Sequence, residues 1–208
     1  MKFSLVIGSY NPNKEWLDNA LKSAEGLFDE IILVDDGSDE PISGATIRKE
    51  NGGFYTARNA GIEKATGDII CSLDDDDEFI RENVLVLKEL CKILDNEVDI
   101  YSFPIELFGE QTGLSFVKTS MGEILNNNQL PSGSWFKKDV WKELSGFQYP
   151  LAEDWDFWAR ARKKGFKFLH FAEPIYKHRI RKDSLSANWI GDKFLEIREE
   201  IRNRYVKA

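Results

Sequence analysis

Cysteine and histidine are scarce in this sequence, which has two of each among its 208 residues. Cys71 and Cys91 both lie in apolar stretches, a position typical of buried core thiols in a reducing compartment. No C-x-x-C or H-x-x-x-H spacing occurs, and such spacings are common among zinc ligands. A cysteine- or histidine-based zinc site is therefore not expected.

Long apolar runs are also missing. No segment approaches the roughly 18 apolar residues that a membrane-spanning helix requires, so no transmembrane segment is predicted. The first residues, MKFSLVIGSYNPN, contain too short an apolar stretch for a signal peptide. No Asn-x-Ser/Thr glycosylation acceptor occurs either. These features favour a cytoplasmic location, with the cytoplasmic face of a membrane included.

Positive charge is in deficit, with 28 Lys+Arg against 36 Asp+Glu and a formal net charge of -8. This balance argues against non-specific binding to nucleic acid or to anionic membranes. The sequence also lacks G-x-G-x-x-G and G-x-x-x-x-G-K-S/T motifs, which argues against dinucleotide and P-loop binding. We therefore expect any phosphate groups of a ligand to be bound through a metal cation rather than through a cluster of lysine side chains.

The first hundred residues instead alternate between strand and helix patterns. Three apolar runs alternate with three stretches of helical periodicity: residues 3–8, 31–34 and 68–73 for strands, and 17–27, 55–65 and 84–94 for helices. Continuous apolar strands separated by amphipathic helices indicate a parallel sheet covered on both faces. We therefore predict one α/β domain of the doubly wound kind over residues 1–208.

A polar cluster follows each of the three predicted strands. The clusters are Ser9-Tyr10-Asn11, Asp35-Asp36-Gly37-Ser38 and Asp74-Asp75-Asp76-Asp77. Ligands of open parallel sheets bind outside the carboxyl ends of the strands. The three clusters therefore predict a single acidic crevice at one edge of the sheet.

The aspartates at 74–77 have two interpretations. A run of charge is usually a solvated loop, and aspartate also favours ordinary turns. However, carboxylates held about 4 Å apart repel by roughly 4 kcal/mol at an effective dielectric near 20, a cost that a bound divalent cation removes. Oxygen ligands of this kind suit Mg²⁺ or Mn²⁺. Spacing alone leaves both interpretations open.

Acidic residues also open the predicted helix at 153–164. The helix dipole favours Glu153, Asp154 and Asp156 at this end, which is a purely structural explanation. A carboxylate beside apolar aromatic residues at a helix start is also well suited to act as a general base. Both explanations stay open at this point.

Taken together, these segments resemble the family 2 glycosyltransferases of GT-A fold. The matching segments follow the family order: SLVIGSYN, EIILVDDGS, ENGGFYTARNAGIEKATGDIICSLDDDD, SGSWFKKDVWKELSGF, EDWDFWARA and HRIRKDSLS. The resemblance implies a Rossmann-like fold with a central, mostly parallel sheet flanked by helices. It also implies that residues 1–107 bind the nucleotide sugar, and that 108–208 bind the acceptor and carry the catalytic base and a C-terminal helix.

The resemblance assigns a role to individual residues. It implies inverting transfer from a nucleotide sugar, expected to be a UDP-sugar, to a hydroxyl of a glycan or glycoconjugate, with Asp154 as the base. The metal, Mn²⁺ or Mg²⁺, would be bound by Asp76 and Asp74, with His178 as a further candidate. The implied nucleotide-sugar-binding residues are Ser9, Tyr10, Asn11, Asp35, Asp36, Arg58, Asn59, Asp74, Asp75, Glu153, Arg179 and Arg181. Peripheral membrane association and a homo-oligomer are left open.

One segment departs from the family pattern. Many relatives carry Tyr-Arg-x-His before Ser-x-Ser, and that histidine can complete the metal site. Alignment on Ser184-Leu185-Ser186 places Arg181 at the histidine position, where it cannot ligate a metal but can contact a diphosphate. His178 could ligate from a neighbouring position, although a lone histidine is more often structural.

Two other functions compete with glycosyl transfer. A non-catalytic sugar-nucleotide or glycan-binding domain would keep the fold without turnover, but the acidic run together with Asp154 argues against it. A sugar-1-phosphate nucleotidyltransferase requires a glycine-rich basic loop after the first strand, where this sequence has Gly8-Ser9-Tyr10-Asn11. Glycosyl transfer in polysaccharide or glycoconjugate biosynthesis is therefore the predicted function.

Overall fold

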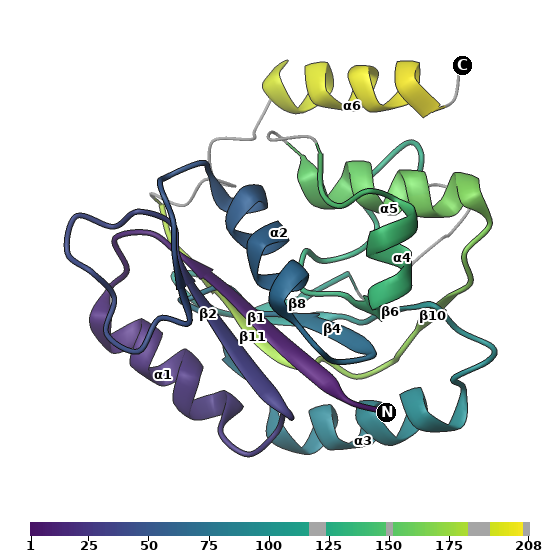
Figure 1. Ribbon diagram of the computed structural model, residues 1–208. Coiled ribbons are helices and arrows are strands. Elements are labelled where there is room, and N and C mark those ends of the chain that lie inside the picture. Colours follow the sequence, from purple (N-terminus) through teal and green to yellow (C-terminus); the bar gives the residue numbers. More distant parts are fainter. Residues whose placement is uncertain (117–123, 149–151, 183–191, 206–208) are drawn as a thin grey trace.

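The computed structural model describes residues 1–116, 124–148, 152–182 and 192–205. A seven-stranded sheet forms the centre of the protein (Figure 1). Its strands, in spatial order, are β10 (Phe168–His170), β6 (Ile100–Ser102), β9 (Trp135–Lys137), β4 (Ile69–Ser72), β1 (Phe3–Ser9), β2 (Glu30–Asp35) and β3 (Ile47–Arg48). Strand β9 is antiparallel to both of its neighbours, and the other pairs are parallel. The predicted mostly parallel sheet is confirmed.

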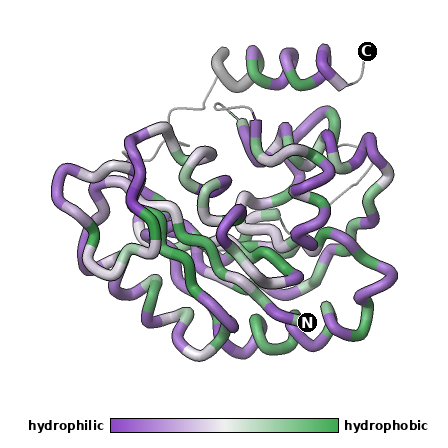
Figure 2. The backbone as a smooth tube through the Cα atoms, viewed as in Figure 1, coloured by the Kyte–Doolittle hydropathy of each residue, from purple (hydrophilic) through white to green (hydrophobic). Residues whose placement is uncertain are grey.

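Helices cover both faces of this sheet. They are α1 (Lys14–Ala24), α2 (Phe54–Lys64), α3 (Arg81–Ile93), α4 (Lys138–Glu143), α5 (Glu153–Lys164) and α6 (Asp192–Tyr205). Figure 1 shows α1 and α3 on one face, α2, α4 and α5 on the other, and α6 outside α5. In the hydropathy colouring of Figure 2, the apolar segments concentrate in the central strands, while hydrophilic segments dominate the outer loops.

The alternation of side chains along β1 explains this layering. All seven residues of β1 are buried. Leu5 and Ile7 belong to the apolar cluster that includes α1 and α3, whereas Val6 belongs to the cluster that includes α2, α4 and α5. Burial of both faces is the reason that this strand appears in the sequence as a continuous apolar run.

A glycine sets the distance between α2 and the sheet. A Cβ atom at Gly61 would lie 2.4 Å from Cγ1 of Val6 and 3.1 Å from Cγ2 of Val34. Only glycine fits at such a close approach of helix and strand. The close packing fixes α2, and with it Arg58, against the end of β1.

A second, four-stranded sheet lies beside the first. Its strands, in spatial order, are β5 (Glu78–Phe79), β11 (Tyr176–Ile180), β7 (Ile105–Gly109) and β8 (Gly113–Ser115). Strand β11 pairs antiparallel with β5 and parallel with β7. The antiparallel pairing brings β11 to the end of the aspartate run. No helix in the described part of the chain is long and apolar enough to cross a membrane.

Candidate active site

The polar ends of β1, β2 and β4 meet at one edge of the sheet. Ser9, the last residue of β1, pairs in register with Asp35 of β2. Its hydroxyl also donates a hydrogen bond to Oδ2 of Asp75, at 2.5 Å. The predicted convergence of the three polar clusters is therefore confirmed.

Asp35 is fully buried and organises the loop that follows β2. Its Oδ1 accepts from the backbone N–H of Ser38 at 2.8 Å. Its Oδ2 accepts from the N–H of Ile42 at 3.1 Å and from Arg48 Nη1 at 2.7 Å. Burial alone would raise the pKa of Asp35, but these hydrogen bonds outweigh it, and the pKa lies below its usual value.

Asp36 is also buried and braces the glycine turn before α2. Its carboxylate lies 2.5 Å from Nζ of Lys49 and accepts from the N–H of Gly53 at 2.9 Å. A further contact runs from the N–H of Gly52 at 3.2 Å. Both aspartates of this cluster therefore point into the protein, where they shape the loops of the crevice.

Tyr10 and Asn11, the two residues that directly follow β1, are exposed to solvent. The side chain of Tyr10 is 51% exposed, which is unusual for an aromatic ring at the end of a buried strand. Asn11 has a positive φ of 46° and is held by reciprocal hydrogen bonds with Asp39, at 3.1 and 2.8 Å. This edge thus presents an exposed aromatic face beside fixed polar groups.

The four aspartates after β4 have separate surroundings. Burial raises the pKa of Asp75 to about 6, with the neighbouring Asp76 and Asp74 adding to the effect. Burial and the charge of Asp74 also raise the pKa of Asp76, whose Oδ2 lies 3.2 Å from Nε of Arg181. Crowded carboxylates with raised pKa values are typical of functional sites.

Asp77 is the most deeply buried member of the run. Its Oδ1 accepts from the backbone N–H of Arg179, and its Oδ2 lies 2.9 Å from Nδ1 of His178. Burial raises the pKa of Asp77, while the contact with His178 acts in the opposite direction. Burial lowers the pKa of His178, but the hydrogen bond and charge of Asp77 outweigh it and raise this pKa to about 9.

One group of side chains has the geometry of a metal site. One ligand atom each from Asp74, Asp77 and His178 lies within 4.8 Å of the others. The two carboxylates suit Mn²⁺ or Mg²⁺ with further oxygen ligands from a substrate, and His178 can add a ligand only in its neutral form. The structure therefore brings together Asp74 and His178, as expected, but with Asp77 in this group instead of Asp76.

Two arginines of this edge stack on aromatic rings. The guanidinium of Arg179 lies 4.3 Å from the ring centroid of Phe108 and 4.7 Å from that of Trp16. The guanidinium of Arg181 lies 5.2 Å from the centroid of the same Trp16 ring. Stacking of this kind holds arginines in fixed orientations. The segment 184–186, used in the family alignment, lies outside the described residues.

Arg58 links the acidic run to the start of α5. Only 2% of this residue is exposed, and its guanidinium lies 4.4 Å from the centroid of Phe54. Its Nη2 is 3.7 Å from Asp74, and its Nη1 is 3.9 Å from Glu153. Within the described residues, neither nitrogen has a hydrogen-bond partner. Buried donors without partners are costly, so their presence favours an anionic ligand here.

Asp154 lies in the first turn of α5 and is half-buried. Its Oδ1 accepts from the N–H of Trp155 at 2.7 Å, and its Oδ2 accepts from Nδ2 of Asn128 at 2.9 Å. Burial raises the pKa of Asp154 despite these hydrogen bonds. Burial and the charge of Asp154 raise the pKa of Glu153 to about 7, against the effect of Arg58.

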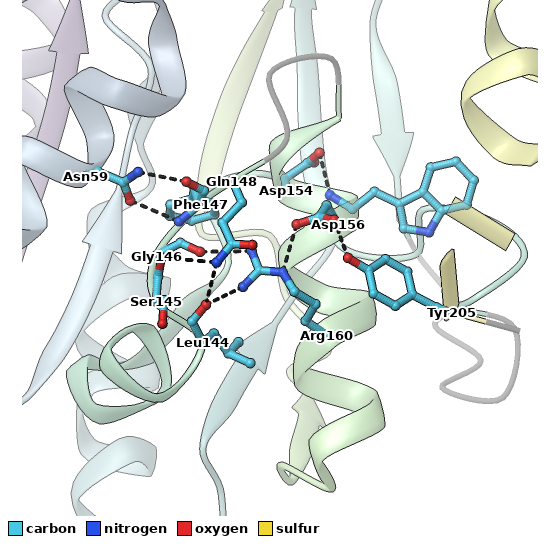
Figure 3. A network of polar contacts seen from close by, with 11 residues as sticks. Asn59, Leu144, Ser145, Gly146, Phe147, Gln148, Asp154, Asp156, Arg160 and Tyr205 are labelled. Atoms are coloured by element: carbon cyan, nitrogen blue, oxygen red, sulfur yellow. Dashed lines mark hydrogen bonds and ion pairs between the residues drawn. The ribbon is translucent and has the colours of Figure 1, made fainter. Parts of the chain in front are cut away.

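A buried polar network holds the start of α5 in place (Figure 3). Asp156 accepts from Tyr205 Oη of α6 at 2.5 Å and from Arg160 Nε at 2.8 Å. Arg160 also donates to the carbonyl oxygens of Leu144 and Gly146, at 2.6 and 2.8 Å. The network therefore ties α5 to α6 and to the loop after α4.

Asn59 extends this network to α2 (Figure 3). Its Nδ2 donates to the carbonyl oxygen of Phe147 at 2.8 Å, and its Oδ1 accepts from the N–H of the same residue at 2.9 Å. Its Oδ1 also accepts from Nε1 of Trp141 at 2.9 Å. The amide of Asn59 thus fixes α2 against the loop after α4.

The comparison with known families fits this geometry. Residues 4–142 match the model of the family described as glycosyl transferase family 2. The chain belongs to this family. It is therefore a glycosyltransferase, and the resemblance inferred from the sequence motifs is confirmed.

Two curated relatives align with most of this glycosyltransferase. The uncharacterized glycosyltransferase YwdF of Bacillus subtilis is 30% identical over 212 residues, covering 90% of this chain and 78% of the relative. The amylovoran biosynthesis glycosyltransferase AmsB of Erwinia amylovora is 28% identical over 217 residues, covering 86% of this chain and 70% of the relative.

Solved structures confirm the GT-A fold. S. aureus TarS 1–349 in complex with UDP-GlcNAc superposes with a TM-score of 0.73 at 17% identity. The match covers 97% of this chain and 65% of that one, so the glycosyltransferase spans about two thirds of the TarS fragment. The UDP complex of the same fragment gives a TM-score of 0.70 at 16% identity.

Two contacts of this glycosyltransferase site were not foreseen from its sequence. Trp16 stacks on Arg179 and Arg181, and its only sequence signal is an aromatic residue in the first turn of a helix. Asn128 contacts Asp154 and lies in an asparagine-rich stretch that offers no motif. Both contacts join segments that are far apart in the chain.

Proposed function

We propose that this glycosyltransferase transfers a sugar from a UDP-sugar to a hydroxyl of a glycan or glycoconjugate, with inversion, in polysaccharide or glycoconjugate biosynthesis. The observation that carries the proposal is the position of Arg58. This buried cation lies between Asp74 of the acidic run and Glu153, next to Asp154. The acidic run and the start of α5, which carries the candidate base, thus lie at the two ends of one guanidinium.

Asp154 is the proposed general base. Its carboxylate accepts the proton of the acceptor hydroxyl while the hydroxyl oxygen attacks the anomeric carbon, and the nucleoside diphosphate leaves from the opposite face. Burial raises the pKa of Asp154, which makes it a stronger base than an exposed aspartate. General-base assistance of this kind contributes about 10²- to 10⁴-fold in rate.

The proposed donor site lies on the other side of Arg58. Asp74, Asp77 and His178 would hold Mn²⁺ or Mg²⁺, which neutralises negative charge on a leaving diphosphate. Arg58 and Arg181 would contact the phosphates directly, because both guanidinium groups lie beside the acidic run. The arginine at position 181 therefore supplies positive charge where many relatives have a histidine.

The proposed nucleotide pocket lies at the ends of β1 and β2. The exposed ring of Tyr10 offers a stacking surface for a base, and Asn11 offers polar groups beside it. The buried Asp35 and Asp36 support this pocket by shaping its loops. The TarS complexes with UDP and UDP-GlcNAc, which share this fold, support the choice of a uridine nucleotide.

The donor can be identified by a thermal-shift panel of UDP, GDP and TDP sugars with Mn²⁺, because a bound ligand stabilises the folded state. Transfer to a panel of simple glycosides then measures activity. In Asp154→Asn we expect Mn²⁺-dependent nucleotide binding to persist while the transfer rate falls by about 10²-fold or more.

Asp139→Asn is the matched control, because Asp139 also lies in the first turn of a helix but its side chain is 80% exposed. This variant should transfer at the wild-type rate. A wild-type rate in Asp154→Asn would show that the base is another residue. An α-linked product from an α-linked donor would contradict inversion, and nucleotide binding without any turnover would favour a non-catalytic binding domain.

A further inference from the structure

The turn that contains Asn128 is held against the start of α5. Nε1 of Trp155 donates to the carbonyl oxygen of Ile124 at 2.6 Å. Leu130, at the other end of the turn, is fully buried, and its N–H lies 3.4 Å from Oδ1 of Asn128. The turn is therefore anchored on both sides of Asn128, with the amide of this residue facing α5.

The two oxygen atoms of Asp154 have different partners. Oδ1 accepts from the backbone N–H of Trp155, which belongs to the same helix. Oδ2 accepts from Nδ2 of Asn128, a residue 26 positions earlier in the chain. A carboxylate oxygen can accept more than one hydrogen bond, so Oδ2 keeps capacity for a substrate proton while Asn128 fixes its direction.

We propose that Asn128 is a positioning residue that orients the Asp154 carboxylate toward the acceptor hydroxyl. The inference rests on the proposed function, in which Asp154 is the general base. The amide donates to the ionised form of Asp154 but carries no charge itself. It can therefore keep Asp154 ionised, the form that accepts a proton, without competing with Arg58 for the carboxylate or for a phosphate group.

The charged groups around Asp154 make this role measurable. Arg58 of α2 favours the ionised form of Asp154, and the neighbouring Glu153 of α5 disfavours it when ionised. The turn that contains Asn128 also packs against Asp154, and Asn128 is its uncharged hydrogen-bond donor to this carboxylate. Its removal leaves the two charged neighbours in place, so the pKa of Asp154 should rise and the acid limb of the activity profile should move to higher pH.

Two variants of Asn128 test the role. Asn128→Leu has a similar volume and removes the donor, and we expect kcat to fall about tenfold, the loss typical of one hydrogen bond to a charged group. Asn128→Asp keeps the shape but adds a like charge, so kcat should fall further and the acid limb should move furthest. In both variants the KM for the donor should stay at the wild-type value.

Asn127→Leu is the matched control. Asn127 lies in the same turn with similar exposure and donates none of the hydrogen bonds to Asp154 among the described residues. The pH profile and kcat of this variant should match those of the wild type. Thermal midpoints of all variants should be recorded with the kinetics, so that a loss of folding is recognised.

The outcomes separate this inference from the proposed function. If Asp154→Asn transfers normally, the general-base assignment fails, and the role of Asn128 fails with it. If Asp154→Asn is inactive but Asn128→Leu keeps the wild-type kcat and acid limb, only the role of Asn128 is overturned. A raised donor KM with an unmoved acid limb in both Asn128 variants would also overturn it, because Asn128 would then shape the donor site.

Discussion

Two acidic clusters lie on either side of β1, and their electrostatic states differ. Asp35 and Asp36, after β2, accept hydrogen bonds from four backbone N–H groups, those of Ser38, Ile42, Gly52 and Gly53, and also contact a basic side chain each. The four aspartates after β4 crowd one another with fewer donors, and the pKa values of Asp75, Asp76 and Asp77 are raised, mainly by burial.

The difference shows that a run of aspartates at a strand end has no fixed role. Where the loop curls back and aims its N–H groups at a carboxylate, the charge is satisfied within the protein and holds the loop in shape. Where the loop aims few N–H groups at the carboxylates, the carboxylates repel one another. A divalent cation would relieve this repulsion. The first cluster thus holds the loops of the crevice in shape, and the second is the proposed cation site.

The largest expected effect is on stability at the first cluster. Asp35→Ala leaves two N–H groups and the Arg48 side chain without their acceptor, which should lower the free energy of unfolding by about 3–5 kcal/mol. Denaturant unfolding in EDTA and in Mn²⁺ should give the same loss. Asp39→Ala, at an exposed position in the same loop, serves as the control, and an equal loss there would contradict the structural role of Asp35.

The next effect concerns the cation. At a Mn²⁺ concentration about 100 times the dissociation constant, the wild type should gain about 2.7 kcal/mol in free energy of unfolding. Asp74→Asn should abolish this gain, because Asp74 belongs to the predicted ligand group. Asp36→Asn should keep the gain despite a lower starting stability. If Asp36→Asn lost the Mn²⁺-dependent gain while Asp74→Asn kept it, the cation would bind at the first cluster and not at the second.

The smallest expected effect is a gain in stability. Burial raises the pKa of Asp75 from its ordinary value of 3.8 to about 6, so ionisation is harder in the folded state. Its contribution to stability is fully present below pH 3.8 and is lost as the pH rises through about 6. Asp75→Asn should therefore be more stable than the wild type by about 1 kcal/mol at pH 8.

The advantage of Asp75→Asn should be nearly lost at about pH 3, where most of the wild-type carboxyl is protonated in both the folded and the unfolded state. Urea unfolding in EDTA at the two pH values measures the difference. A variant that is less stable than the wild type at pH 8 would show that the hydrogen bond from Ser9 outweighs the crowding of charge.

The elements that form by local patterning were predictable. The apolar runs that became β1, β2 and β4 and the periodic stretches of α1, α2 and α3 stand out in the sequence because each strand is buried on both faces and each helix on one. Their order implied the parallel sheet and the edge at which the polar clusters meet. The ordered motifs then indicated the glycosyltransferase family.

The four-stranded sheet was not predictable. Its strands β5 and β8 have two and three residues, which are too short to show a period. Strand β11 holds its place through pairing with segments about 100 residues and about 70 residues earlier in the chain. Such pairings depend on the packing of the whole domain and leave no local pattern.

By itself, the sequence determined that an acidic crevice lies at the carboxyl ends of parallel strands, because alternation of apolar strands and amphipathic helices is a local property of the chain. Only the tertiary structure decided which carboxylates are satisfied within the protein, which are crowded together and which distant side chain contacts Asp154. Asp77 meets His178 across 101 positions, and Asn128 meets Asp154 across 26. Hydrogen bonds act over about 3 Å, so only the folded chain, which brings distant segments together, can assign these partners.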